Sequence, residues 1–339
     1  MTEPTAVRLL SPEEIAARTA DETPFLRFAE PRLFAERAVR LRQLAAGHPM
    51  RDYLLFAAEL AQAQQAAFDA PRLVELPGQD QLAAAARAGL PPLAPTAWRR
   101  SPHWQDDLAL LLATLQERLS PGRTREVVDG LAAELPQRLD QQADRLLAGV
   151  MLGLDLAAAP LIGAALQVWW MRLVARTQAA HPALAFGRTD DAAACPCCGS
   201  RPVASVARIG AAEAGARYLH CALCQSQWHL VRIQCSHCGS GNKIFYQELE
   251  AGEGAALPTV PVPRGAVRAE CCDECGHYLK IVAMDKDPHV EPVADDLASL
   301  TLDLLVSEAG QTRHGVNFLL LFGAPPEETA AGALPAGAS

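Results

Sequence analysis

Apolar residues recur with the spacing of amphipathic helices through the first 190 residues. In residues 31–49 they fall three and four positions apart, and a glycine and a proline close the run. This periodicity predicts a helix with one apolar face and a defined end. A second helix is expected from about Met50 to Phe68. The apolar face of the first helix comprises Leu33, Phe34, Ala38, Leu41 and Ala45.

Helix start signals divide this part of the chain further. The segment SPEEIAARTA begins at Ser11 with a candidate N-cap, a proline at the first helical position and a glutamate that completes a capping box. Residues 89–98, GLPPLAPTAW, form a proline-rich break, and another capped amphipathic run begins at Ser101. We therefore predict a helical bundle over residues 1–190, with alanine and leucine stripes in its core.

One segment of this bundle is apolar on all sides. It runs from Leu156 to Met171, contains a proline and a glutamine, and is flanked by Asp155 and Arg172. A membrane-spanning helix needs about 20 apolar residues, so this segment is too short to span a bilayer. We predict a buried core helix instead, in which Trp169 and Trp170 are core or partner-facing aromatics.

The pattern changes at Cys195, where short runs rich in valine, isoleucine, tyrosine and phenylalanine replace the helical periodicity. Such runs, bounded by turn residues, predict β-strands. The expected strands are RPVASVARI (201–209), RYLHC (217–221), WHLVRIQ (228–234), NKIFYQEL (242–249) and HYLKIVAM (277–284).

These patterns together predict an α+β chain. A helical domain over residues 1–190 is followed by two rubredoxin-like or zinc-ribbon β modules, each with a four-cysteine metal site. We place the first module at 191–233 and the second at 234–290, with a C-terminal helix and flexible tail at 291–339. Two domains are expected on length alone, because 339 residues exceed what one core usually supports.

All ten cysteines lie between Cys195 and Cys275. Eight of them form four C-x-x-C pairs in the predicted turns between strands, a spacing that directs two thiolates at one metal ion. Four sulfurs complete a tetrahedral site, so eight predict two ions. The pairs are Cys195/Cys198, Cys221/Cys224, Cys235/Cys238 and Cys272/Cys275.

Sequential pairing is the favoured arrangement: the first two pairs share one ion and the last two share the other. Interleaved and nested pairings are the alternatives. Glycine follows the second cysteine of three pairs, at Gly199, Gly239 and Gly276, where a positive φ is useful. Gln225 takes this position in the remaining pair.

Two cysteines remain outside the pairs, Cys197 and Cys271, and we expect them to be packed small residues rather than ligands. The run CCDEC also permits a register in which Cys271 pairs with Cys275. Histidines lie near the pairs as well. With two complete sulfur sets we expect them to form hydrogen bonds or to lie on the surface; they are His220, His229, His237 and His277.

The net charge of the chain and its first residues limit the classes of function that we expect. The net charge of −9 and the absence of a lysine and arginine run argue against a nucleic-acid-binding zinc ribbon. Residues 1–14 lack the basic and apolar segments of an export signal, so we expect a cytosolic protein. In a reducing cytosol, closely spaced thiols bind metal or act in catalysis more often than they form structural disulfides.

The cysteine region resembles the formate dehydrogenase accessory protein family, FdhE. The resemblance rests on CPCCGSRPVASV, RYLHCALCQSQWHLVRIQCSHCGS and DKDPHVEPVADDLASLTLD, within residues 195–303. It implies a cytoplasmic protein, needed for active respiratory formate dehydrogenase, that acts on the catalytic subunit of that enzyme. It also implies iron in rubredoxin-like sites. Thiol spacing alone does not distinguish two iron ions from two zinc ions.

Two functions remain in view. A maturation factor is favoured over a rubredoxin-like iron electron-transfer protein, because two metal modules on a large helical bundle suit a docking role. The chain shows no nucleophile with a base, phosphate loop or carboxylate pair typical of an enzyme, so we expect a non-enzyme. Asp295 and Asp296 are predicted to cap or face the start of a helix on which Asp303 follows.

Overall fold

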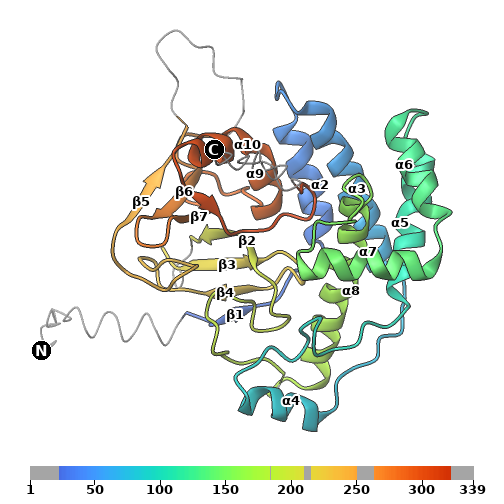
Figure 1. The fold of residues 1–339 in the computed structure, drawn as a ribbon, viewed down its shortest axis with the longest axis horizontal. Coiled ribbons are helices and arrows are strands. Elements are labelled where there is room, and N and C mark those ends of the chain that lie inside the picture. Colours follow the sequence, from blue (N-terminus) through green and yellow to red (C-terminus); the bar gives the residue numbers. More distant parts are fainter. Residues whose placement is uncertain (1–22, 184, 210–214, 250–262, 322–339) are drawn as a thin grey trace, which may run out of the picture.

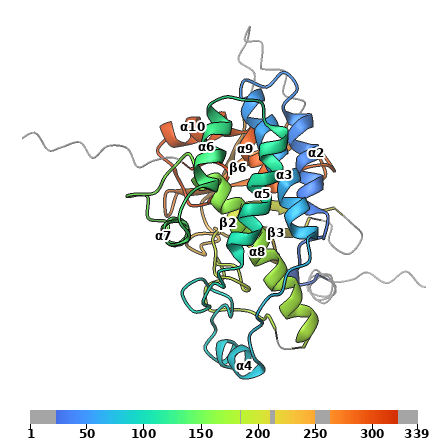
Figure 2. The same ribbon diagram turned by 90° about the vertical axis from the view of Figure 1, so that its right-hand side faces the viewer.

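The computed structural model describes residues 23–183, 185–209, 215–249 and 263–321. The helix start expected at Ser11 and the tail expected beyond residue 321 lie outside these ranges. Among the described residues, α2 to α8 gather on one side of the molecule and the strands on the other, with α9 and α10 packed against the strands (Figure 1). Turning the molecule shows α2, α3, α5 and α8 lying side by side (Figure 2).

The helical part follows the predicted order. The helices expected over residues 31–49 and 50–68 are confirmed as α2 and α3, and α5 begins three residues after Ser101. The bounds are α2 Leu33–Leu44, α3 Arg51–Asp69, α4 Gln79–Arg87, α5 Trp104–Arg118, α6 Arg123–Ala132, α7 Pro136–Ala148 and α8 Ala159–Ala180.

Helix α8 is the centre of the core, as its all-round apolar sequence predicts. Trp169 and Trp170 are fully buried, and the Trp170 indole donates a hydrogen bond to the Leu93 carbonyl at 3.0 Å. In the part of the chain that the structure describes, no helix is both long enough and apolar enough to span a membrane. The predicted core helix is therefore confirmed from Ala159 onward, whereas Leu156 precedes α8 and is exposed.

The strands of both cysteine regions form one sheet, in the order β1-β4-β3-β2-β7-β6-β5, with β8 added to β7. The join between the two regions is the parallel pairing of β2 with β7, in which Ser205 lies opposite Ile281. The bounds are β1 Leu26–Arg27, β2 Pro202–Ala207, β3 Arg217–Cys221, β4 Gln227–His229, β5 Ile244–Gln247, β6 Val267–Cys272, β7 His277–Ala283 and β8 Thr312–Arg313.

Two strand predictions need correction. The strand expected over 228–234 stops at His229, and Val231 and Ile233 beyond it are 60% and 65% exposed as the chain turns toward Cys235. Strand β6 was not predicted, because its sequence VRAECC carries two charges. In the fold, the carboxylate of Glu270 is buried in an ion pair with Arg217 at 2.7 Å, so a charged residue occupies a strand interior.

The predicted C-terminal helix is present as two short helices, α9 (Pro292–Ala298) and α10 (Leu300–Glu308). Glu291, rather than an aspartate, caps α9 by accepting a hydrogen bond from the Ala294 amide at 2.7 Å. Asp295 lies in the first turn, as expected, and accepts from the Glu291 amide at 2.7 Å. Both aspartates of the predicted cap are buried.

Buried ion pairs tie these C-terminal helices to the rest of the fold. Arg40 of α2 pairs with Asp295 at 2.6 Å and with Asp287 at 2.8 Å. On the other side of α9, Asp296 pairs with Lys280 of β7 at 2.9 Å and with Arg313 at 2.8 Å. Buried ion pairs on the two sides of α9 thus join the helical part to the sheet.

Replacing Arg40 by alanine is expected to lower the free energy of unfolding by about 3–5 kcal/mol, since two buried carboxylates would lose their partner. The control is Arg42→Ala on the same helix, whose pair with Glu59 is partly exposed and worth about 0–1 kcal/mol. Urea unfolding of the two variants measures the difference. Equal, small losses would contradict a stabilising role for the buried cluster.

Candidate metal centres

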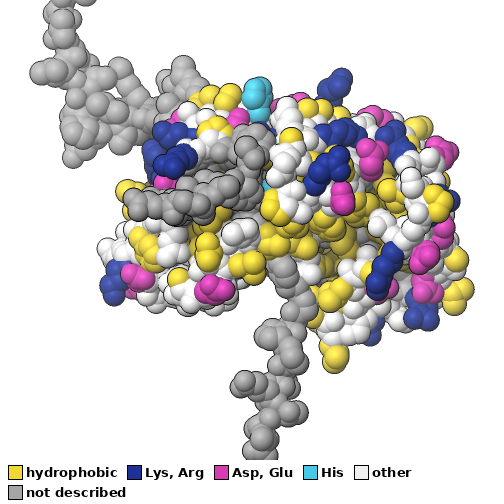
Figure 3. Space-filling model, turned by 90° about the horizontal axis from the view of Figure 1, so that it is seen from above, with side chains coloured by type: hydrophobic (Ala, Val, Ile, Leu, Met, Phe, Trp, Pro, Cys, Tyr) yellow, Lys and Arg dark blue, Asp and Glu magenta, His cyan; other side chains and the backbone are white. Residues whose placement is uncertain are grey.

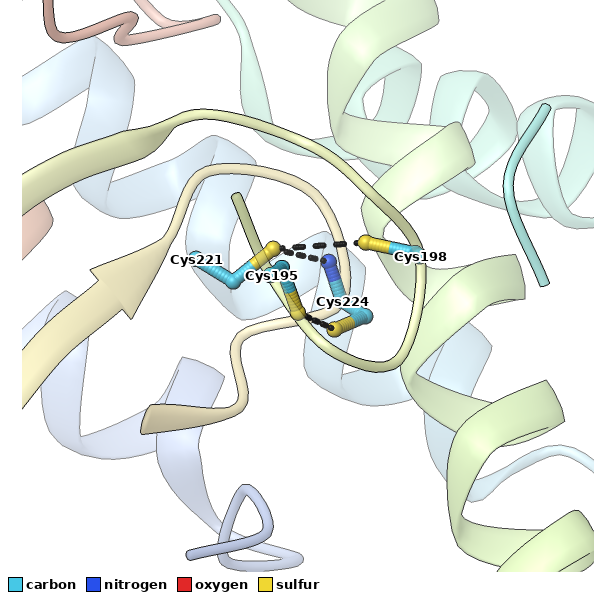
Figure 4. A group of neighbouring side chains, drawn as sticks. All are labelled: Cys195, Cys198, Cys221 and Cys224. Carbon is cyan, nitrogen blue, oxygen red and sulfur yellow. Dashed lines mark hydrogen bonds between the residues drawn. The ribbon is translucent and has the colours of Figure 1, made fainter. Parts of the chain in front are cut away.

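The first centre is a sealed group of four sulfurs from two turns (Figure 4). Cys195 and Cys198 lie in the loop before β2, Cys221 ends β3, and Cys224 lies in the turn that leads to β4. The Sγ atoms of Cys195 and Cys224 are 3.5 Å apart, and those of Cys198 and Cys221 are 3.4 Å apart. All four side chains are fully buried.

These distances fit a shared metal ion and do not fit disulfides. Sulfurs bound at about 2.3 Å to a tetrahedral ion lie roughly 3.7 Å apart, whereas bonded sulfurs lie about 2.05 Å apart. Burial raises the pKa of the thiols of Cys195, Cys198 and Cys221 well above the ordinary value. Burial acts the same way on Cys224, but hydrogen bonds from the neighbouring thiols hold its pKa well below that value. Four thiolates would need a cation among them.

Turn geometry accounts for the residues after each pair. Gly199, Gly239 and Gly276 have φ of 70°, 75° and 68°, as predicted. Gln225 adopts φ of 64° in spite of its side chain. That side chain donates to the carbonyls of Ala222 and Leu223 at 3.0 and 3.2 Å, which closes the turn around the metal centre.

Gln225 also links the first centre to the helical part. Its side-chain carbonyl oxygen accepts a hydrogen bond from Nη2 of Arg37 in α2 at 2.6 Å. The same Nη2 atom also donates to the Glu291 carboxylate at 2.9 Å. From another side, Gln167 of α8 donates to the Ala222 carbonyl at 2.8 Å. The four cysteines belong to the same hydrophobic cluster as α3, α5 and α8. The first centre is therefore part of the main core.

The second centre is built in the same way but faces solvent. Cys235 and Cys238 precede β5, Cys272 ends β6, and Cys275 lies in the turn before β7. The Sγ atoms of Cys235 and Cys275 are 3.7 Å apart, and those of Cys238 and Cys272 are 3.9 Å apart. Cys238 is exposed and Cys275 is half-buried, whereas Cys235 and Cys272 are buried.

The structure thus brings together the two sets of four that sequential pairing predicts. Cys197 and Cys271 stay outside both sets. The Cys197 thiol is buried 3.9 Å from the Ser226 hydroxyl. Cys271 points away from Cys272 along β6, and burial raises the pKa of its thiol to about 12. Cys272, rather than Cys271 of the alternative register, lies with the other three sulfurs of the second set.

The histidines divide into two kinds. His220 is fully buried, lies within hydrogen-bond distance of Gln225 and Gln227, and has its pKa lowered to about 4 by burial. His237 and His277 stack at the second centre, with ring centroids 3.8 Å apart. Their ligand nitrogens and the sulfur of Cys275 lie within 4.8 Å of one another. The sequence placed these histidines near the centre but did not indicate that they meet.

Away from the cysteines, the helical part has an apolar cavity of about 440 Å³ between the starts of α3, α6 and α8. From above, hydrophobic side chains gather around a hollow in the surface (Figure 3). Leu156, on the rim, is 41% exposed. The apolar lining of the cavity includes Tyr53, Phe56, Val127, Leu156, Leu161 and Leu320.

Comparison with known proteins covers nearly the whole described chain. Three family models match in succession: "FdhE, N-terminal" over residues 23–184, "FdhE, central domain" over 194–232 and "FdhE, C-terminal domain" over 233–320. A "Protein FdhE homolog" of Edwardsiella ictaluri (strain 93-146) is 41% identical over 293 residues, which cover 86% of this chain and 89% of that protein.

Two further relatives agree with this match. "Protein FdhE" of Escherichia coli O9:H4 (strain HS) is 37% identical over 323 residues, covering 94% of this chain and 99% of that protein. The crystal structure of the FdhE protein from Pseudomonas aeruginosa superimposes with a TM-score of 0.76 at 36% identity. That alignment covers 89% of this chain and all of the other.

Proposed function

We propose that this chain, which belongs to the FdhE family of formate dehydrogenase accessory proteins, binds the catalytic subunit of a respiratory formate dehydrogenase in the cytoplasm during maturation. The observation that carries this proposal is the match to FdhE proteins over the helical part and both cysteine centres. In this role the chain acts as a binding partner rather than as a catalyst.

The two centres would each hold one ion through four thiolates, iron or zinc. The first set is Cys195, Cys198, Cys221 and Cys224, and the second is Cys235, Cys238, Cys272 and Cys275. Sulfur separations of 3.4–3.9 Å support this assignment, because a tetrahedral site requires about that spacing. Bound ions would stiffen the sheet and hold the helical part against it.

A rubredoxin-like electron carrier is the less favoured function. The relatives reported above carry the FdhE name, and they match the large helical part as well as the cysteine centres. The first centre is also fully enclosed, which is a poor position for electron exchange with another protein. A metal-stabilised scaffold accounts for both centres and for the helical part.

We place the contact with the catalytic subunit at the apolar cavity between α3, α6 and α8. This cavity has a volume of about 440 Å³, and its lining is aromatic and aliphatic. Apolar clefts with a few polar groups at the rim are typical binding sites. Here the rim carries Asp52 and Arg123, so an apolar side chain of the subunit could enter while polar neighbours pair at the edge.

Leu156→Glu is expected to weaken binding of the purified catalytic subunit by about tenfold or more, because it puts a charge where apolar surface would be covered. Leu73→Glu is the matched control, since Leu73 is 89% exposed and lies away from the cavity lining. Calorimetric titration measures both affinities. If the two variants bind equally well, the contact lies elsewhere, whereas failure of the unaltered chain to bind would reject the proposed function itself.

A further inference from the structure

We propose that His237 and His277, together with Cys275, form a separate capture site that takes a divalent transition-metal ion from solution and passes it to the second centre. The three residues come from distinct places: the turn of the Cys235/Cys238 pair, the first residue of β7, and the turn before β7. This proposal rests on the metal ion proposed for the second centre, but not on the partner of the chain.

The geometry of the three side chains already approaches that of a metal site. Their ligand atoms lie within 4.8 Å of one another, and the two imidazoles stack with planes 9° apart. Nitrogen and sulfur ligands of one tetrahedral ion lie roughly 3.3–3.8 Å apart, so the ligand atoms must approach by about 1 Å. One imidazole must also rotate out of the stack, so that both nitrogen lone pairs point at the ion. Imidazole and thiolate are both good ligands for Zn²⁺ and Fe²⁺.

A hydrogen bond prepares one imidazole for this role. The Nδ1 atom of His277 lies 2.7 Å from the carbonyl oxygen of Cys275. Because a carbonyl can only accept, Nδ1 carries the proton and Nε2 keeps its lone pair for an ion. Behind the pair, His314 lies 5.4 Å from the His237 ring and its Nε2 is 2.8 Å from the Ser236 hydroxyl. This contact anchors the turn that carries His237.

The exposure of the side chains indicates the route by which an ion reaches the second centre. His237 and Cys238 are exposed, and Cys275 and His277 are half-buried, whereas Cys235 and Cys272 lie beneath them. A cavity of about 200 Å³ opens beside His237 and Cys238. The cavity is also lined by Cys235, so an ion from solution reaches His237 and Cys238 at the surface with one inner thiol directly beside them. The first centre has no such arrangement, since all four of its cysteines are buried.

Transfer requires only ligand exchange. The hydrated ion loses water as it binds the two imidazoles and the sulfur of Cys275, whose proton passes to water. The sulfurs of Cys238, Cys235 and Cys272 then replace the imidazole nitrogens, and each thiol releases its proton to water. Cys275 remains a ligand throughout, the metal keeps its oxidation state, and both imidazoles are released unchanged.

The test is the rate of Co²⁺ uptake by the reduced full-length chain in which only the solvent-facing second centre has been emptied with a chelator, followed through thiolate-to-cobalt absorbance. His237→Ala/His277→Ala is expected to slow filling of the second centre about tenfold, the lower end of what a neighbouring metal partner is worth. The final cobalt content should stay unchanged. His229→Ala, which alters a histidine outside both clusters, is the control and should fill at the original rate.

A second measurement examines the capture site without the centre it serves. In Cys235→Ser/Cys238→Ser/Cys272→Ser, Co²⁺ should still bind weakly at this location with nitrogen ligands, and adding the two histidine changes should abolish that binding. Equal uptake rates in the unaltered chain and the double histidine variant would overturn the proposal. So would faster cobalt release with unchanged uptake, which would give the imidazoles a purely stabilising role.

Discussion

Cys221→Ser/Cys224→Ser protein is expected to lose one metal ion and, with it, much of the helical part. The sulfurs of this first centre lie in the same hydrophobic cluster as α3, α5 and α8. A structural zinc site contributes about 10–16 kcal/mol of apparent binding energy, whereas a whole domain is stable by only about 5–15 kcal/mol. Loss of the ion would also leave Arg37 and Gln167 bonded to a turn without support.

The matched variant is Cys235→Ser/Cys238→Ser at the second centre. It should also lose one ion, but it should retain its helical signal, because Tyr278 and Leu302 beside this centre belong to a separate small cluster. Metal analysis and far-ultraviolet circular dichroism, run in parallel on the two variants, measure both effects. Unchanged metal content in either variant would reject that centre, and equal helix loss in both would reject the difference between them.

This expectation goes beyond what cysteine spacing alone predicts. From the sequence, each C-x-x-C pair is an independent local unit, and its loss should spare the helical bundle. The structure places the two centres in different surroundings although their spacing is alike. Burial of the first is caused by α8 and by the residue 93 region, whose amide donates to the Cys197 carbonyl at 3.0 Å. The sequence near Cys195 gives no indication of this contact.

Local patterns did predict the elements whose causes are local. The apolar face of α2, the all-round apolar sequence of α8, and the glycines after three cysteine pairs each follow from a few neighbouring residues. The sequential grouping of the cysteines was likewise accessible, because paired turns at the ends of adjacent strands leave few other ways to collect four sulfurs.

Elements that depend on distant partners could not be predicted from the sequence. Strand β6 was hidden by Glu270, whose charge is neutralised by Arg217 on another strand. Gln225 takes the place of the glycine in one pair, and its side chain accepts a hydrogen bond from Arg37, 188 residues away. From the local sequence alone, a charged residue is predicted to be exposed to solvent. A charge can be buried at low cost only when its partner is also present, and the partner lies far away in the sequence.

The different surroundings of the two centres also suggest a division of roles. An enclosed ion that holds α2 and α8 against the sheet is suited to maintaining shape. A metal ion at the partly exposed second centre, with imidazoles beside it, could bind and dissociate while the rest of the fold persists. Loading of the second centre would then adjust the local sheet edge without unfolding the helical surface that we propose for partner binding.

Deletion of the gene is expected to abolish formate-dependent dye reduction in a host that relies on its respiratory formate dehydrogenase, while the catalytic-subunit polypeptide remains present. This follows from the proposed function, since a missing maturation factor removes activity without removing its target. Immunoblotting of the subunit alongside the dye assay separates the two. Normal dye reduction in the deletion strain, with no second copy of the factor, would contradict the proposed role.

Complementation of that strain with variants shows which part of the chain the activity needs. Cys195→Ser/Cys198→Ser should fail through loss of the folded protein, which immunoblotting would reveal as low abundance. Cys235→Ser/Cys238→Ser should fail while its protein accumulates, since the second centre lies outside the main core. Leu156→Glu should also accumulate and fail, whereas Leu73→Glu should restore dye reduction. Full activity from the Cys235→Ser/Cys238→Ser variant would mean that the second centre is dispensable for maturation, and the role proposed for it would be wrong.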